Sequence, residues 1–464
     1  MHVRAMAAAV ALAATLWAAT PLPVAASAVW LAAGDVHLDP FDRSAVPAPP
    51  GKDSNSALLA SAIRAMRAAD PDPAVVLLTG DFLAHHWAEL VRQRGGGATA
   101  EDAAAQAMRA MAAAFGRAFP RAAFVLALGN NDAPCGDYRS DPQGRFVRET
   151  ALAWAPLVDR HGSSPGFARG IAGGGYYTVQ LPAQRLQLVV LDTVLFSQEY
   201  RGACAGGDSA AAALSWLRTT LRAVPPGTRN VVLMHVPPGY DAFSTEFTHG
   251  FLPWPYLNAR DNAELVQVLD DARSRVAFSI AGHAHRFDVR LFGGAPLIVL
   301  GSISPVYRND PVFYRLRVGD GLEDLAAYAY DRGPGRWRGP DDFDRTWRVE
   351  RLDTASLARV HARLAIDPVA RTAWGAASVA WAEHLPRRLR VWRASTWRIP
   401  WCAQTLPADG FAGCAGIEHR AAIATVAIVA VGLLALVGVA AAAVAVARVL
   451  RAGRQRKGSV PKPE

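Results

Sequence analysis

The sequence predicts an α/β fold in which helices cover a central β-sheet. Between residues 29 and about 300, short apolar runs rich in Val, Ile and Leu alternate with longer amphipathic segments. The apolar runs lack the polar–apolar alternation of half-exposed strands, as expected for strands that are covered on both faces. Strands that alternate with helices in this way favour a layered α/β domain.

The individual elements follow from the same two patterns. Strands are predicted at 29–35, 74–81, 123–130, 186–192, 230–235, 276–283 and 296–302. Amphipathic periodicity predicts helices at 54–69, 101–118, 208–222 and 261–273. Asp53 and Ser54 are the candidate N-caps of the first helix. Further strands at 312–330 precede a region with helical periodicity and several Trp and Arg, 351–400.

The two ends of the chain are predicted to lie outside the folded part. Residues 1–28 contain Arg4, an apolar stretch and small residues at 26–28, which is the layout of a secretory signal peptide. Residues 421–447 contain no charged side chain, and a helix of this length crosses a hydrocarbon core of roughly 30 Å. A buried soluble helix is the less favoured alternative, because such helices rarely lack a polar face.

Charge gives the expected orientation of this predicted transmembrane helix. Six basic residues fall in the tail 448–464, whereas only Arg420 lies just before the helix, so we expect a cytoplasmic tail and an extracytoplasmic main domain. The net charge of +9 is therefore largely a topology signal, and nucleic-acid binding is not expected.

Four cysteines, an even number, lie in the part expected to be exported. An oxidising compartment favours disulfides over thiol chemistry. Of the three possible pairings we favour Cys135–Cys204 with Cys402–Cys414, the second closing a short loop before the membrane.

Five of the predicted strands end in side chains that can bind a metal ion. These side chains are Asp35, His37, Asp81, Asn130, His235, His283 and His285. Taken alone, each fits an ordinary turn, surface or core residue. Together they predict a site for two metal ions with a central bridging carboxylate, because the carboxyl ends of strands in an α/β sheet converge on one crevice.

These motifs resemble a known family signature. DVH (35–37), GD (80–81), GNND (129–132), His235 and GHAH (282–285) are similar to the motifs of the calcineurin-like metallophosphoesterases. Further segments resemble its acid sphingomyelinase-like phosphodiesterase and endopolyphosphatase branch: GDVHLDP, GDFLAHH, HVPPG, SPVYRNDPVF and CAQTLPADGFAGC. The resemblance covers residues 29–415.

The resemblance implies a metallophosphoesterase sandwich of central β-sheets flanked by helices, at 29–350, followed by a helical and disulfide region at 351–416. It implies one metal ion held by Asp35, His37 and His285. A second would be held by Asn130, His235 and His283, with Asp81 bridging. Imidazoles and carboxylates suit zinc, and also iron or manganese. The two ions would activate a water for in-line attack on phosphorus.

The GNND motif departs from the family pattern, which has GNH followed by Asp or Glu. Asn131 replaces the His that protonates or steadies the leaving oxygen, and an amide cannot act as a general acid. We therefore expect Asn131 to contact a phosphoryl oxygen. His85, four residues after Asp81, resembles a second active-site His of the sphingomyelinase-like group, and the resemblance implies that it donates the proton. Asp132 is expected to be a turn or cap residue, and His86 a surface residue.

The sequence thus predicts an exported, membrane-anchored phosphoesterase that acts on a small-molecule, lipid or polyphosphate substrate. The alternative is a non-catalytic receptor or structural ectodomain on the same fold, although such a protein has no need of all seven ligands. The missing His modestly favours phosphoanhydrides, which have stable leaving groups. Four aromatic residues between 247 and 256 line a substrate rim or pack within a loop.

Overall fold

The computed structural model describes residues 27–204, 210–382, 385–386, 390–418 and 433–447. Within them the strands form two six-stranded sheets and one two-stranded ribbon. The first sheet has the order β14-β13-β12-β1-β4-β5, and the second has the order β10-β11-β9-β8-β7-β6. The predicted α/β sandwich is confirmed.

All seven strands predicted individually from the sequence are present, with bounds that are shorter or shifted by one residue. The first sheet contains β1 (Ala28–Ala33), β4 (Val75–Leu78), β5 (Ala123–Leu126), β12 (Val312–Val318), β13 (Leu322–Asp331) and β14 (Arg336–Asp342). The second contains β6 (Tyr177–Leu181), β7 (Leu186–Leu191), β8 (Arg229–Met234), β9 (Val276–Ala281), β10 (Asp288–Arg290) and β11 (Leu297–Val299). The ribbon pairs β2 (Leu38–Asp39) with β3 (Ser54–Asn55).

Strand direction brings the strand ends together. In the first sheet β1, β4 and β5 are parallel neighbours, and in the second β7, β8, β9 and β11 are parallel. The other strand pairs of both sheets are antiparallel. In parallel neighbours the carboxyl ends lie at the same edge, which is where an α/β fold places its ligands.

The two sheets pack face to face. Leu188 and Val190 of β7 belong to the main core, whereas Val189 and Leu191 belong to a second apolar cluster with the helices that cover this sheet. The alternation follows from the two-residue period of a strand, which sends successive side chains to opposite faces. Trp30 of β1 contacts Phe278 of β9, with ring centroids 6.1 Å apart, and so joins the two inner faces.

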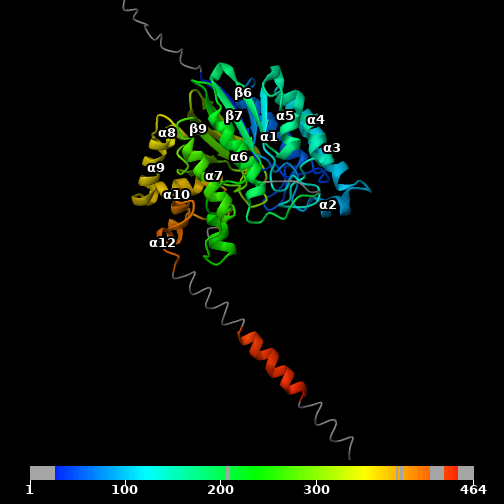
Figure 1. Cartoon of the computed structure of the whole chain (residues 1–464), viewed down its shortest axis with the longest axis vertical. Coiled ribbons are helices and arrows are strands. Elements are labelled where there is room, and N and C mark those ends of the chain that lie inside the picture. Colours follow the sequence, from blue (N-terminus) through cyan, green and yellow to red (C-terminus); the bar gives the residue numbers. More distant parts are fainter. Residues whose placement is uncertain (1–26, 205–209, 383–384, 387–389, 419–432, 448–464) are drawn as a thin grey trace, which may run out of the picture.

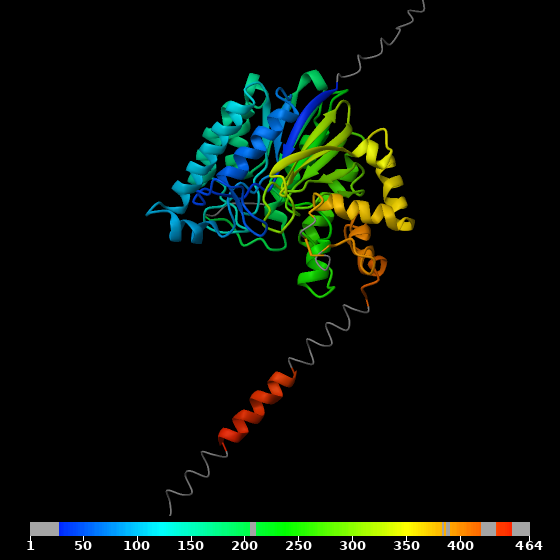
Figure 2. The ribbon, with the colours of Figure 1, turned by 180° about the vertical axis from the view of Figure 1, so that it is seen from behind.

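Helices cover the outer faces of the sandwich. Figures 1 and 2 show α1 (Ser56–Ala69), α3 (Ala100–Ala118), α4 (Arg145–Val158) and α5 (Phe167–Gly174) gathered on one side, with α2 (Trp87–Arg94) beyond them. Helices α6 (Ala210–Arg222) and α7 (Ala259–Asp271) cover the second sheet. Single turns of other helix types lie at Arg160–Gly162, Pro182–Gln184, Val194–Phe196 and Ser244–Thr248.

The predicted N-caps of the first helix are wrong. Asn55 caps α1, because its side-chain oxygen accepts the Leu58 backbone N–H. Asp53 instead binds His85 through both its carboxylate oxygens. The side chain of Asp53, which the local sequence predicts to cap the helix, makes a tertiary contact with His85 instead.

The region after the sandwich is helical, as predicted. It contains α8 (Phe343–Trp347), α9 (Thr354–Ile366), α10 (Pro368–Ser378), α11 (Arg398–Ala403) and α12 (Phe411–Ala415). Gln404 joins it to the second sheet, since its side-chain amide donates to Asp288 and its backbone carbonyl accepts from the Leu291 N–H. Both favoured disulfides, Cys135–Cys204 and Cys402–Cys414, are present and confirm that pairing.

The predicted signal peptide lies almost wholly outside the described residues, as do residues 421–432 of the predicted transmembrane helix and the basic tail 448–464. Residues 433–447 are helical and exposed. None of the helices in the described part of the chain is both long and apolar enough to cross a membrane.

Candidate metal centre

The seven candidate ligands come together where the carboxyl ends of strands from the two sheets meet. Asp35 and His37 follow β1, Asp81 follows β4, and Asn130 follows β5. From the second sheet, His235 follows β8, and His283 and His285 follow β9. Six of the seven are buried, and His283 is partly buried.

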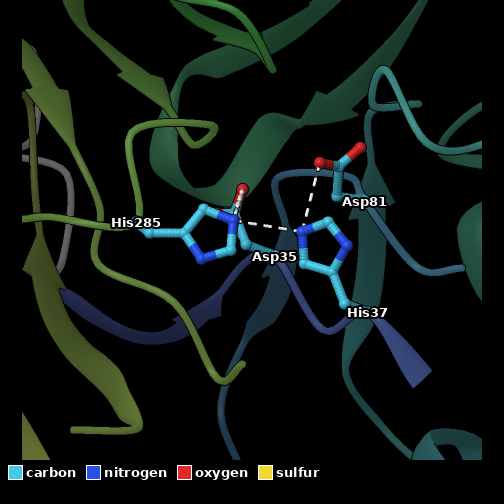
Figure 3. Close-up of side chains that lie close together, drawn as sticks. All are labelled: Asp35, His37, Asp81 and His285. Atoms are coloured by element: carbon cyan, nitrogen blue, oxygen red, sulfur yellow. Dashed lines mark hydrogen bonds and ion pairs between the residues drawn. The ribbon is translucent and has the colours of Figure 1, made fainter. Parts of the chain in front are cut away.

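Asp35, His37, Asp81 and His285 form the first of two ligand clusters (Figure 3). The Nε2 atoms of His37 and His285 lie 3.1 Å apart. Asp81 Oδ2 lies 3.2 Å from His37 Nε2, and Asp35 Oδ1 lies 3.6 Å from His285 Nε2. All four side chains present a ligand atom to one small volume.

The second cluster shares Asp81 with the first. Asp81 Oδ2 lies 3.3 Å from His235 Nε2, and His283 completes the group. Asn130 Oδ1 lies 3.0 Å from His235 Nε2 and 2.7 Å from His283 Nδ1. The carboxylate of Asp81 therefore stands between the two sets of ligands.

Backbone carbonyl groups orient two of the imidazoles. The Nδ1–H of His37 donates to the Leu83 carbonyl at 3.2 Å, and that of His235 donates to the Thr79 carbonyl at 2.8 Å. A proton on Nδ1 leaves the Nε2 lone pair to face the cluster, which is the arrangement found around metal-binding histidines.

The site is held in a strained backbone conformation. Five of the seven candidate ligands have positive φ angles, between 44° and 71°: Asp35, His37, Asp81, His283 and His285. The left-handed region costs a non-glycine residue about 1–3 kcal/mol and is concentrated at functional sites. The rest of the fold must therefore hold these side chains in place.

Steric contacts explain why the GNND and GHAH motifs begin with glycine. A Cβ atom at Gly129 would lie 2.1 Å from Asp81 Oδ1, and one at Gly282 would lie 2.4 Å from Thr79 Oγ1. Only glycine lets the ends of neighbouring strands approach so closely.

The charge states favour a cation. Burial lowers the pKa of His283 to about 3 and that of His285 well below its usual value, so both rings are neutral. Burial would by itself raise the pKa of Asp81, but His235 and His37 outweigh it and hold that pKa well below its usual value. The site thus combines an ionised carboxylate with two neutral imidazoles, as a metal ion requires. Burial would by itself lower the pKa of His235, but the Asp81 and Asp35 carboxylates outweigh it and raise that pKa to about 9, so a cation bound there would displace a proton from the ring.

The donor set fits divalent metal ions. Imidazole nitrogens with carboxylate and amide oxygens suit zinc, iron and manganese. Asp35 Oδ2 is buried and has no hydrogen-bond partner among the described residues. A bound cation would satisfy such an oxygen, whose burial is otherwise costly.

Asn131 and Asp132 support the loops around Asp81. The Asn131 backbone N–H donates to Asp81 Oδ1 at 2.8 Å, and its side-chain Nδ2 donates to Oδ2 at 2.9 Å. The Asp132 carboxylate accepts hydrogen bonds from the backbone N–H groups of Phe82, Leu83 and Gly129. Asp132 is therefore a loop-joining residue, and a substrate contact by Asn131 stays a prediction.

His85 lies beside the first cluster. Its ring stacks on His37, with centroids 4.1 Å apart, and its Nδ1–H donates to Asp53 Oδ1 at 2.7 Å. Asp53 Oδ2 also accepts the His85 backbone N–H at 3.0 Å. His86, by contrast, has a side chain that is 82% exposed, as expected of a surface residue.

A cavity of about 380 Å³ opens beside the two clusters. Asp81, Asn130, His283 and His285 line it from the side of the two ligand clusters, and His85 and Asn131 also line it. Its other walls include Tyr138, Glu199, Asp241, Trp254, Arg286 and Tyr307. Trp254 stacks on His249, whereas Tyr256 is buried, so the aromatic segment both packs within its loop and lines the cavity.

Sequence reasoning missed two residues of this site. Asp53 lies 32 positions from His85, and nothing in its local sequence separates it from a helix cap. Arg286 follows the GHAH motif but belongs to no ligand pattern. The fold alone places Arg286 in the cavity wall and brings Asp53 into contact with His85, which lines the cavity.

The model of the calcineurin-like phosphoesterase family matches residues 30–287, more than half of the chain and all seven candidate ligands. The chain is 24% identical to sphingomyelinase phosphodiesterase D of Dictyostelium discoideum over 63% of its length. It is 26% identical to acid sphingomyelinase-like phosphodiesterase 3b of Mus musculus over 53%. The matched regions span 65% and 51% of these relatives.

A solved dimetal phosphatase from Danio rerio aligns over 65% of this chain and 95% of its own, with 15% identity and a TM-score of 0.42. The family match itself covers every strand end that carries a candidate ligand. The chain therefore belongs to the calcineurin-like phosphoesterase family, the metal-dependent phosphoesterases whose motifs its sequence resembles.

Proposed function

We propose that this protein hydrolyses phosphodiester or phosphoanhydride bonds at a centre of two divalent metal ions. Asp35, His37 and His285 would hold one ion, and Asn130, His235 and His283 would hold the other, with Asp81 bridging. When bound, the ions would neutralise phosphoryl oxygens and supply a water of lowered pKa. Zinc is the first candidate, with iron or manganese as alternatives.

The shared carboxylate carries this proposal. Asp81 Oδ2 lies within 3.3 Å of His37 Nε2 and of His235 Nε2, which belong to different clusters. A carboxylate in contact with two ligand sets is the arrangement that a two-metal hydrolytic site needs. His85, which lines the same cavity, is the proposed proton donor to the leaving group, and Asp53 orients its ring.

The alternative is a non-catalytic receptor or structural protein on the same fold. Metal analysis of the purified protein separates the two functions. We expect about two bound ions per chain, and hydrolysis that stops on chelation and returns when metal is restored. Substantially fewer than two ions, with no hydrolysis after metal is added, would favour the receptor function.

The relatives named above support a phosphodiester as one substrate class, and the missing His at Asn131 supports a phosphoanhydride. The experiment is a panel of sphingomyelin, an aryl phosphodiester, ATP and long-chain polyphosphate with the metal-loaded protein. We expect hydrolysis of at least one of these substrates, and failure on all four with both ions bound would contradict the proposed function.

We further propose that the protein is exported and anchored by residues 421–447, with its catalytic domain extracytoplasmic. The uncharged stretch and the six basic residues after it support this topology. Protease added to intact cells should then cleave the domain and leave the basic tail protected. Full protection of the domain, together with its cleavage after the cells are opened, would reverse the orientation.

A further inference from the structure

Arg286 stands apart from every other residue around the catalytic cavity. Among the described residues that line this cavity, it is the one Lys or Arg side chain. The residue is only 9% exposed. Within the described part of the chain no carboxylate forms an ion pair with it, and its buried Nη1 has no hydrogen-bond partner. A buried charge is costly unless it is paired.

Both oxygens of the Asp241 carboxylate, and one oxygen of the Glu246 carboxylate, have other partners. Asp241 Oδ1 accepts the backbone N–H groups of Phe243 and Ser244, and Oδ2 accepts the Ser244 hydroxyl. Glu246 Oε1 pairs with Arg393. The Phe243 ring lies 4.4 Å from the Arg286 guanidinium carbon, and this contact covers one face and leaves the N–H edge for a ligand.

From this unpaired cation we infer that Arg286 recognises a second anionic group on the substrate, next to the phosphoryl group that reacts. The inference rests on the proposed function and narrows its substrate class. Arg286 directly follows His285, whose ring belongs to the first metal-ligand cluster, and both line the same cavity. A guanidinium binds phosphoryl oxygens through paired hydrogen bonds. The substrate class it fits is a phosphoanhydride, in which a second phosphoryl group adjoins the first.

The competing explanation is structural. Glu246 Oε2 is also buried without a hydrogen-bond partner, and the Glu246 carboxylate interacts electrostatically with Arg286. In that case Arg286 would stabilise the loop of residues 241–256 and would not discriminate between ligands.

The test compares Arg286→Gln with the intact metal-loaded protein in equilibrium binding of two non-hydrolysed probes. Methylenediphosphonate carries a second anionic group, whereas phosphocholine carries a cation in its place. We expect Arg286→Gln to weaken methylenediphosphonate binding by about 10- to 100-fold, the worth of a charge-assisted hydrogen bond, and to change phosphocholine binding far less. Arg286→Lys should recover part of the loss. Arg308→Gln, at an exposed arginine outside the cavity lining, is the matched control.

Equal loss for both probes, or no loss for either, would overturn the inference, and equal loss together with a lowered Tm would support the structural explanation. Turnover distinguishes this result from failure of the proposed function. For hydrolysis, the ratio of kcat/KM on ADP to kcat/KM on an aryl phosphodiester should fall by about the same factor in Arg286→Gln, mainly through KM. If the wild-type protein has no turnover and Arg286→Gln still loses methylenediphosphonate binding selectively, the proposed hydrolase function is refuted and the anion-binding role of Arg286 is supported.

Discussion

Replacing Asp81 with Ala should lower kcat/KM by about 10³-fold or more. Loss of a single oxyanion-hole donor already costs on the order of 10²–10³-fold, and Asp81 contacts both ligand clusters. The variant should also bind less metal, because each proposed ion loses a ligand. The measurements are steady-state kinetics on whichever substrate the panel identifies, and metal content per chain.

Asp72→Asn is the matched control for this variant. Its carboxylate pairs with Arg121 on the surface, so the substitution should leave turnover and metal content near normal. Asn131→Ala is a second comparison, because it removes only the side-chain hydrogen bond to Asp81 and keeps the backbone one. Near-normal turnover of Asp81→Ala with two well-occupied metal sites would refute the bridging assignment.

Replacing His85 with Ala should have the second-largest effect, and the effect should depend on the leaving group. General-acid catalysis contributes about 10²–10⁴-fold where the leaving oxygen is basic, as in an alkyl ester, and little where it is an activated aryl oxide. The decisive quantity is the ratio of the alkyl to the aryl ester rate, measured in wild type and variant. An unchanged ratio would mean that His85 is not the proton donor.

Asp53→Asn tests how His85 is held. Loss of the carboxylate that orients the ring should lower the alkyl ester rate by about 10- to 100-fold, as for other oriented histidines. Because both residues act through one imidazole, the double variant should be no worse than His85→Ala alone. Additive losses for Asp53 and His85 would show that they act separately.

Asn131→Ala should instead lower alkyl and aryl rates by a similar factor, since a phosphoryl contact does not depend on leaving-group basicity.

The positions of the central strands could be predicted from the sequence because they depend on local patterns of apolar residues. Apolar runs without alternation mark strands that are covered on both faces, and all seven of those predicted individually are present. The antiparallel edge strands β6, β10 and β14 were not predicted, and neither were α4 and α5. Strands β10 and β14 are the more polar of these edges, and an edge strand needs less apolar sequence than a central one.

The candidate ligands could also be predicted from the sequence, because each follows a buried strand and parallel strands end at a common edge. His37, His235 and His283 could be named without knowing any distance between them. That Asp81 lies between the two clusters follows from the approach of β4 to both sets of strand ends, and the family resemblance supplied it in advance.

Sequence alone thus determined the layered α/β fold and the seven strand-end donors. It favoured one of three cysteine pairings, and the structure confirmed that pairing. Tertiary structure alone decided the partners of individual side chains. Asp53 binds His85 in place of capping α1, Asn131 donates to Asp81, and Arg286 lies unpaired at the cavity. The physical reason is that strand and helix patterns depend on neighbours a few residues away. A carboxylate or a guanidinium instead takes whichever partner the packed chain brings within hydrogen-bond distance.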